Sequence, residues 1–277
     1  MSSLPPILAA PLLSEVEAKL LELLRSLTPQ EWSRPTLAPQ WSVRQVAAHL
    51  LDTHLRKLSM VRDGFFAEMP RIDGPASLTK FVNRMNQEGV AIYSRFSTPV
   101  LLSLLESAAR ESCEFHLSLD PFARATFAVS WAGESESLNW FDTARELTER
   151  WHHQQQIRVA VNRPGILTRE LYHPVLDCFL RVLPFTYRDV EAPVGTVVQV
   201  HIAGECGGDW NLHRETGGWM LQLEPEASPT ARAVIPQEIA WRLFTKGISR
   251  AEADPLIVVE GDPRLTAPIF SAIAIVG

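Results

Sequence analysis

The sequence predicts an α+β fold, in which an N-terminal helical bundle precedes a smaller domain of strands and helices. Two observations lead to this prediction. Apolar residues recur at helical spacing up to about residue 190, whereas after Pro193 they alternate with polar residues, as they do in strands. The 277 residues are also enough for one large or two ordinary domains. We therefore expect a helical domain over residues 1–190 and an α+β domain over residues 191–277.

Six long helices are expected in the N-terminal domain, each with an apolar stripe and a start or stop signal. Ser14 and Glu17 have the spacing of a capping box, so the first helix should begin near Ser14 and run to about residue 27. Ser42 and Gln45 repeat this spacing and should open the second helix. The other four are expected at about residues 78–96, 99–119, 140–161 and 168–187.

The C-terminal domain is expected to consist of short strands and two helices. Two of the strands should form a hairpin, because the glycines of the turn at residues 216–218 tolerate positive φ. The expected strands cover residues 198–202, 210–212, 219–223, 231–235 and 256–259, and the expected helices cover residues 236–244 and 268–276.

The composition argues against several classes of function. The 32 acidic and 26 basic residues give a net charge of -6, and no run of like charges marks a nucleic-acid-binding arm. No apolar run approaches the length of a membrane span. The three cysteines show no Cys-x-x-Cys spacing, and the N-terminus lacks a basic leader. These features predict a reduced, cytoplasmic protein with neither a nucleic-acid nor a membrane partner.

The stretch 142–158 carries one half of a metal site. Glu149 and His153 are four residues apart, which places them about 40° apart on one helix face. A carboxylate and an imidazole on adjacent turns can bind the same divalent ion, but two ligands rarely hold a metal alone. Taken by itself, the pair is equally well explained as a hydrogen-bonded pair on a surface helix.

His49 is the best candidate for the third ligand. It lies near the middle of the second helix, beside the apolar stripe, from where an imidazole can point into a bundle. His54 lies about 140° further around this helix, and His152 lies about 100° from His153, so neither should face the same ion. A site of His49, Glu149 and His153 leaves a fourth position for water, substrate or thiol, as in catalytic zinc sites. The alternative for His49 alone is a hydrogen-bonded core histidine.

Two parts of the sequence resemble a known family. Residues 27–32 and 41–50 resemble the N-terminal signature of the DinB-like, maleylpyruvate isomerase-type helical bundle family, and residues 149–158 resemble its second metal motif. The resemblance implies an up-and-down four-helix-type bundle that binds a divalent metal, zinc or alternatively nickel. It implies as ligands the histidine of the first motif, His49, and the Glu and His of the second.

The C-terminal domain is similar to the sterol carrier protein-like module that follows this bundle in mycothiol-dependent members. This similarity depends on the order of the strands and on residues 240–247. It implies an isomerase or thiol transferase in which mycothiol, or another low-molecular-weight thiol, attacks a small activated, anionic substrate. Arg242 is the first candidate for a contact with the anionic substrate, and Arg232 and Arg214 are further candidates. For all three, the alternative is a solvated side chain on the surface.

Gln156 departs from the family's pattern. The family usually has an aspartate three residues after the metal-binding histidine of the second motif, and here Gln156 stands at that position. A glutamine side chain can still hydrogen bond next to the metal and thiol cofactors, but it brings no charge. The departure therefore weakens the inference about the particular reaction more than the inference about the metal.

Two other classes of function stay open. The same three ligands could activate water in a metal-dependent hydrolase, for which a general base is needed. The metal could also be structural, in a non-catalytic module that binds a metal or an apolar ligand. The expected partners are a small-molecule substrate and a thiol, and a homodimer is left open.

Overall fold

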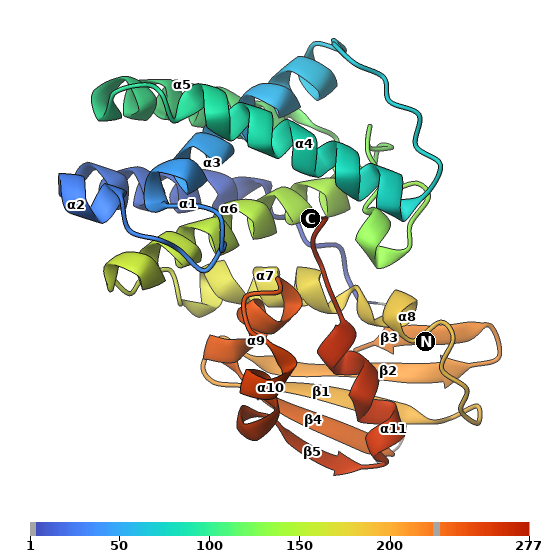
Figure 1. Ribbon diagram of the computed structural model, residues 1–277. Helices are drawn as coiled ribbons and strands as arrows, with labels where there is room; N and C mark the ends of the chain where they lie inside the picture. Colours follow the sequence, from blue (N-terminus) through green and yellow to red (C-terminus); the bar gives the residue numbers. More distant parts are fainter. Residues whose placement is uncertain (1–3, 224–227, 277) are drawn as a thin grey trace. The chain divides into compact units, whose positions relative to one another are not determined.

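The computed structural model describes residues 4–223 and 228–276. Helices are followed by a small sheet with further helices (Figure 1), which confirms the predicted α+β fold class. The helices before the sheet are α1 Ala10–Arg25, α2 Pro29–Trp32, α3 Val43–Lys57, α4 Pro75–Tyr93, α5 Thr98–Ser118, α6 Asn139–Val161, α7 Arg169–Leu180 and α8 Leu183–Thr186. Among the described residues, no helix is both long and apolar enough to cross a membrane.

The sheet consists of β1 Val197–Ala203, β2 Gly208–Glu215, β3 Gly218–Gln222, β4 Ala231–Pro236 and β5 Val258–Gly261, and α9 Gln237–Phe244, α10 Arg250–Ala253 and α11 Pro263–Thr266 accompany it. Its strand order is β3-β2-β1-β4-β5. The central strand, β1, pairs antiparallel with β2 and parallel with β4. Because Val198, Val200 and Ile202 alternate with polar residues along β1 and are fully buried, one face of the sheet forms a core.

The described chain divides into two compact units. The bundle unit contains residues 8–126 and 149–166, and the sheet unit contains residues 127–148 and 167–275 together with residues 4–7. α6 thus contributes residues to both units, and α7 and α8 belong to the sheet unit. The units divide the chain elsewhere than at residue 190, so the domain limits 1–190 and 191–277 stay a prediction.

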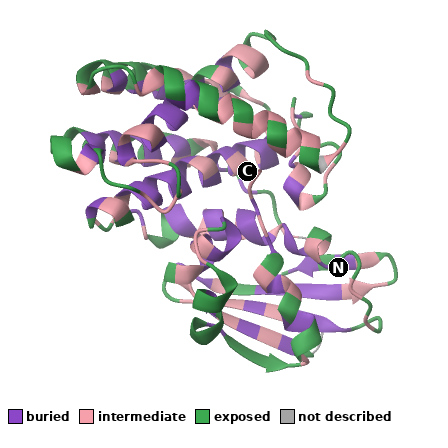
Figure 2. Ribbon diagram, in the orientation of Figure 1, coloured by how far each residue is buried: buried purple, intermediate pink, exposed green. Residues whose placement is uncertain are grey.

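The bundle unit has a continuous apolar core to which α1, α3, α5 and α6 all contribute. Most residues of α6 are buried, as are most of those in the central strand of the sheet (Figure 2). This shared core holds together the helices that carry the candidate site. Its fully buried members include Leu20, Val43, Val46, Leu50, Leu51, Leu101, Leu105 and Ile157.

The capping box predicted at the start of α3 is present. Gln45 Oε1 accepts hydrogen bonds from the backbone N–H of Ser42 at 2.9 Å and from its hydroxyl at 3.0 Å. At its other end α3 continues into a π-helical turn, Leu58–Arg62, which local sequence patterns do not predict. The beginning of the helix that carries His49 is therefore set by its own sequence.

The predicted start of the first helix is wrong. α1 begins at Ala10, with Pro11 in its first turn, where a missing N–H costs nothing. Ser14 therefore lies inside the helix and does not cap it. Glu17 is buried, with 3% of its surface exposed.

Two other expected helices differ from the structure. The sixth expected helix, residues 168–187, agrees with the start of α7 and the end of α8 but is divided between them, with Pro184 in the first turn of α8. The chain after Ser271 is not helical. Ala272 and Ala274 are buried and alternate with partly exposed neighbours, which is the pattern of an extended chain, and the N–H of Ala274 donates to Phe244 O.

Candidate metal centre

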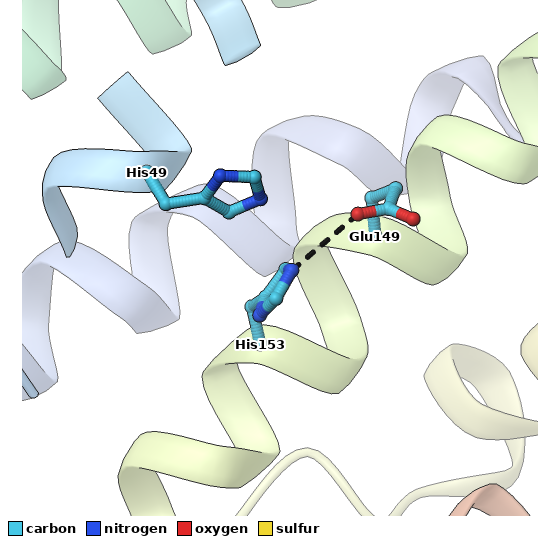
Figure 3. Close-up of side chains that lie close together, drawn as sticks. All are labelled: His49, Glu149 and His153. Atoms are coloured by element: carbon cyan, nitrogen blue, oxygen red, sulfur yellow. Dashed lines mark ion pairs between the residues drawn. The ribbon is translucent and has the colours of Figure 1, made fainter. Parts of the chain in front are cut away.

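The three side chains proposed as metal ligands lie close together in the bundle unit. His49 comes from α3, and Glu149 and His153 come from successive turns of α6. One potential ligand atom of each lies within 4.8 Å of the other two. Figure 3 shows the two imidazoles and the carboxylate directed towards one common space. The structure thus supplies the third donor that the pair on α6 lacks.

The pair on α6 is not an ordinary surface pair. His153 is buried, with 7% of its surface exposed, and Glu149 is partly buried. His153 Nε2 lies 3.4 Å from Glu149 Oε2, the contact drawn as a dashed line in Figure 3. The ring centroids of His49 and His153 are 4.6 Å apart. The two histidines and the carboxylate are therefore close enough to share one ion.

His49 is not explained as a hydrogen-bonded core histidine. It is buried, with 3% of its surface exposed, and its Nδ1 has no hydrogen-bond partner within the described residues. Burial lowers the pKa of His49 well below its ordinary value, and the neighbouring charge of His153 adds to this shift. At neutral pH the imidazole is uncharged, which is the form that binds metal.

The protonation state of Glu149 also suits a ligand. Burial raises its pKa, but the hydrogen bond from His153 and the charges of His152, His153 and His49 outweigh burial and lower the pKa to about 2. Glu149 is therefore a carboxylate at neutral pH. The two imidazoles of His49 and His153 and the carboxylate of Glu149 form a nitrogen and oxygen donor set that fits a divalent ion such as zinc or nickel.

Gln156 lies next to His153, as expected from its place on the same stripe of α6. Its Oε1 is 2.9 Å from His153 Nδ1. An amide oxygen only accepts, so Nδ1 is the donor in this contact, and Nε2 is the nitrogen that faces Glu149. Gln156 can thus orient His153 without supplying the charge of an aspartate.

Trp41 is a neighbour of the site that the sequence analysis overlooks. Its ring centroid lies 4.7 Å from that of His49 and 6.1 Å from that of His153. Its position just before the N-cap of α3, within the first motif, could have indicated that Trp41 lies near the site. His152 stacks on His153 with centroids 4.0 Å apart, but it is not part of the converging group. His54 is also outside the group, as predicted.

The arginines proposed for substrate binding belong to the sheet unit. Arg242 lies on α9, and its Nε donates to Gly247 O at 3.2 Å. Arg232 lies on β4 opposite Gln199 of β1, and Arg214 donates to the carbonyl oxygen of its neighbour Glu215. All three are partly exposed. Their contact with an anionic substrate stays a prediction.

A family model decides the family of the chain. The model described as "Mycothiol maleylpyruvate isomerase N-terminal domain" matches residues 13–158, which is more than half of the chain. The chain belongs to this family. The segment that matches the mycothiol maleylpyruvate isomerase N-terminal domain includes both motifs and the three converging side chains. No curated protein matches the chain in sequence.

Two solved structures are similar to the chain over most of its length. A histidine-to-alanine mutant of the mycothiol-dependent maleylpyruvate isomerase aligns with a TM-score of 0.55 at 11% identity, covering 94% of this chain and 96% of the other. A second structure of the mycothiol-dependent maleylpyruvate isomerase aligns with a TM-score of 0.49 at 12% identity, covering 88% and 91%. The first similarity shows a shared fold, and a shared fold does not establish a substrate.

Proposed function

We propose that the protein is a metal-dependent enzyme that uses a low-molecular-weight thiol, mycothiol or a related compound, to isomerise a small activated substrate or to transfer the thiol to it. One observation carries the proposal: His49, Glu149 and His153 converge within 4.8 Å in a chain of the mycothiol maleylpyruvate isomerase N-terminal domain family. These residues would hold zinc or nickel and leave a coordination position for the thiol.

The charge of the donor set favours a thiolate in that position. A bound divalent ion lowers the pKa of a coordinated thiol, so that thiolate is present at neutral pH. His49 is uncharged and Glu149 is ionised, as their pKa shifts indicate. One carboxylate neutralises only part of the charge of a divalent ion, and the remainder attracts an anionic fourth ligand.

The cysteines of the chain do not suit the role of nucleophile. Cys113, Cys178 and Cys206 are all buried, and burial raises the pKa of each thiol. Cys113 does contact the second motif, through Arg150, but it is not part of the converging group. Buried, protonated thiols are poor nucleophiles, which supports a thiol supplied from solution.

An activated, anionic alkene is the proposed substrate class. Addition of a thiolate to such a double bond turns it into a single bond, about which the molecule can rotate. The addition leaves an enolate: expulsion of the thiolate from it gives the cis-trans isomer, whereas uptake of a proton from solvent gives a thiol conjugate. Arg242 is the proposed contact for a substrate carboxylate, because a guanidinium binds carboxylates through two parallel hydrogen bonds.

A direct test combines metal loading with a thiol titration. The purified protein is analysed for metals, reloaded with Co²⁺ and titrated with mycothiol, with glutathione and cysteine for comparison. We expect a thiolate-to-cobalt charge-transfer absorption and a binding enthalpy by calorimetry at submillimolar mycothiol. Turnover of maleylpyruvate and related cis-alkenes in the presence of mycothiol is then measured by absorbance.

The same titration distinguishes the alternatives. If the protein binds the metal but no thiol at millimolar concentration, it is not a thiol-dependent enzyme. The function would then be either hydrolysis by metal-activated water or a non-catalytic role with a structural metal. A hydrolase would also need a general base. His54 is buried and lies about 140° around α3 from His49, and neither it nor His152 belongs to the converging group, so neither is well placed for that role.

A further inference from the structure

Glu17 of α1 contacts both helices that carry the candidate ligands. Its Oε1 lies 3.1 Å from Nε2 of His54 on α3 and 3.5 Å from Nε of Arg150 on α6. All three residues are buried, with exposed fractions of 3%, 1% and 2%. One carboxylate oxygen in the interior of the bundle unit therefore joins α3 to α6.

Arg150 extends this contact to a fourth helix. Its Nη2 donates to Ser112 Oγ at 2.8 Å, and its Nη1 donates to Cys113 Sγ at 3.2 Å; both acceptors are on α5. The planar guanidinium is thus held on two sides, by Glu17 and by α5. We refer to Glu17, His54, Arg150, Ser112 and Cys113 as the buried clamp.

The buried clamp is separate from the metal centre, although it uses the same helices. His54 lies about 140° around α3 from His49, and Arg150 lies about 100° around α6 from Glu149. No residue of the clamp belongs to the converging group. The clamp therefore cannot supply ligands, and any effect on the metal must act through the positions of α3 and α6.

Metal binding demands accurate helix positions. A shift of one helix by a single residue moves its side chains by about 1.5 Å, whereas metal–ligand distances are held within about 0.2 Å. Leu20, Leu50 and Ile157 pack between the same helices, but apolar contacts are not directional. The attraction between Glu17 and Arg150 strengthens as their distance shortens, and a buried charge without its partner is strongly unfavourable.

We propose that Glu17 is a positioning residue for the metal centre. It fixes the axial position of α3 against α6 and thereby the distance of His49 from Glu149 and His153. This inference rests on the proposed function, because it assumes that the three ligands hold a metal. Glu17 lies outside the metal site, and the geometry of the site depends on it.

The experiment compares Glu17→Gln with the wild type in the full-length protein, using Co²⁺ as the probe. Glutamine keeps the size of the side chain and removes its charge. We expect the dissociation constant for Co²⁺ to rise at least tenfold and the ligand-field absorption bands to shift, because the ligands no longer meet at the same distances. Glu17→Asp keeps the charge on a shorter side chain and should recover part of both readouts.

Leu24→Ala is the matched control, because Leu24 is a fully packed residue of the same helix and does not belong to the clamp. A cavity at this position should lower thermal stability, while the Co²⁺ affinity and spectrum, measured well below the melting temperature, stay those of the wild type. This comparison separates a loss of position from a general loss of stability.

Four results would overturn the inference. Glu17→Gln could bind Co²⁺ with wild-type affinity and spectrum, or Leu24→Ala could change both as strongly as Glu17→Gln does. If Glu17→Gln does not fold, Glu17→Asp carries the test, and wild-type behaviour in that variant refutes the role. A wild-type protein that binds no Co²⁺ refutes the proposed function as well, so the two failures are distinguishable.

Discussion

Oε1 of Gln156 lies 2.9 Å from Nδ1 of His153. Gln156 follows His153 on α6 by about one helical turn, and Glu149, which contacts the other ring nitrogen, precedes it by about one turn. This contact selects the tautomer of His153 in which Nε2 is free to bind a metal. An amide oxygen accepts the hydrogen bond without carrying a charge, so it raises the electron density of the imidazole less than a carboxylate does. Compared with an aspartate at this position, Gln156 would hold His153 in the same orientation but make it a weaker candidate ligand.

Replacement of Gln156 by leucine should weaken metal binding about 10–100-fold, because the orientation and tautomer of His153 are no longer fixed. Gln156→Glu restores a carboxylate and should bind at least as tightly as the wild type. Both affinities can be measured by competition with a chelator of known affinity.

Gln155→Leu is the control for these variants. The Gln155 amide is also buried on α6, but its Nε2 donates to Gly165 O and not to a candidate ligand. Its loss should lower stability without altering metal affinity. Equal weakening in both leucine variants would show that Gln156 acts on the helix and not on His153.

Removal of His49 should abolish stable metal binding, since two ligands on one helix are too few. At a metal concentration of about 100 times the dissociation constant, the wild type should gain about 2.7 kcal/mol in its free energy of unfolding. His49→Ala should gain almost none. Chemical denaturation with and without metal measures this difference, and elemental analysis gives the metal content.

His201→Ala tests whether any histidine would have the same effect. His201 lies on β1 in the sheet unit and contacts Asp209. This variant should keep the metal content and the metal-dependent stabilisation of the wild type. Full metal content in His49→Ala would rule out the ligand set.

Trp41 should report on occupancy of the site, because its ring lies against both imidazoles. Co²⁺ and Ni²⁺ quench indole fluorescence at short range, so titration of the wild type should lower its emission. Trp41→Phe should lose a large part of this quenching and bind metal a few-fold more weakly, as the packing around His49 loosens.

Trp219→Phe should quench like the wild type. Trp219 lies in the sheet unit, where its Nε1 donates to Val190 O at 2.8 Å. Quenching that is unchanged in Trp41→Phe and lost in Trp219→Phe would contradict the placement of the metal in the bundle unit.

The metal-free protein should lose stability as the pH falls below 6.5, the ordinary pKa of the His49 imidazole. In the folded state burial keeps this pKa well below 6.5, so in acid the unfolded chain binds a proton that the folded chain does not. The free energy of unfolding then falls by up to about 1.4 kcal/mol per pH unit until the folded pKa is reached.

Urea denaturation on both sides of pH 6.5 measures this effect, and His49→Gln provides the comparison. Glutamine does not titrate, so the variant should lose less stability over the same interval. An identical pH dependence in the two proteins would mean that His49 is not held in its uncharged form.

The candidate ligands could be predicted because each depends on a local pattern. The spacing of Glu149 and His153 is enough to place them on one helix face. The helix that carries His49 can be recognised from its capping residues, Ser42 and Gln45. The fold class could be predicted for a similar reason, since the change from helical to alternating periodicity is visible without any knowledge of the packing.

Contacts between distant segments could not be predicted in this way. Glu17 has the spacing of a capping residue, yet Pro11 moves the helix start upstream and leaves Glu17 inside the bundle unit with His54 and Arg150. No local pattern reveals this. The apolar sequence at the end of the chain is also compatible with a helix. Contacts with distant residues stabilise the extended form, among them the hydrogen bond from the N–H of Ala274 to Phe244 O.

The helix that carries Glu149 and His153 begins in one compact unit and ends in the other, so neither unit is a continuous stretch of the chain. Genetic recombination with a single crossover exchanges continuous stretches only. A single crossover therefore cannot move the bundle unit alone: a cut after residue 166 carries residues 127–148 of the sheet unit with it, and a cut after residue 126 leaves Glu149 and His153 behind. Recombination therefore exchanges either unit only together with part of the other.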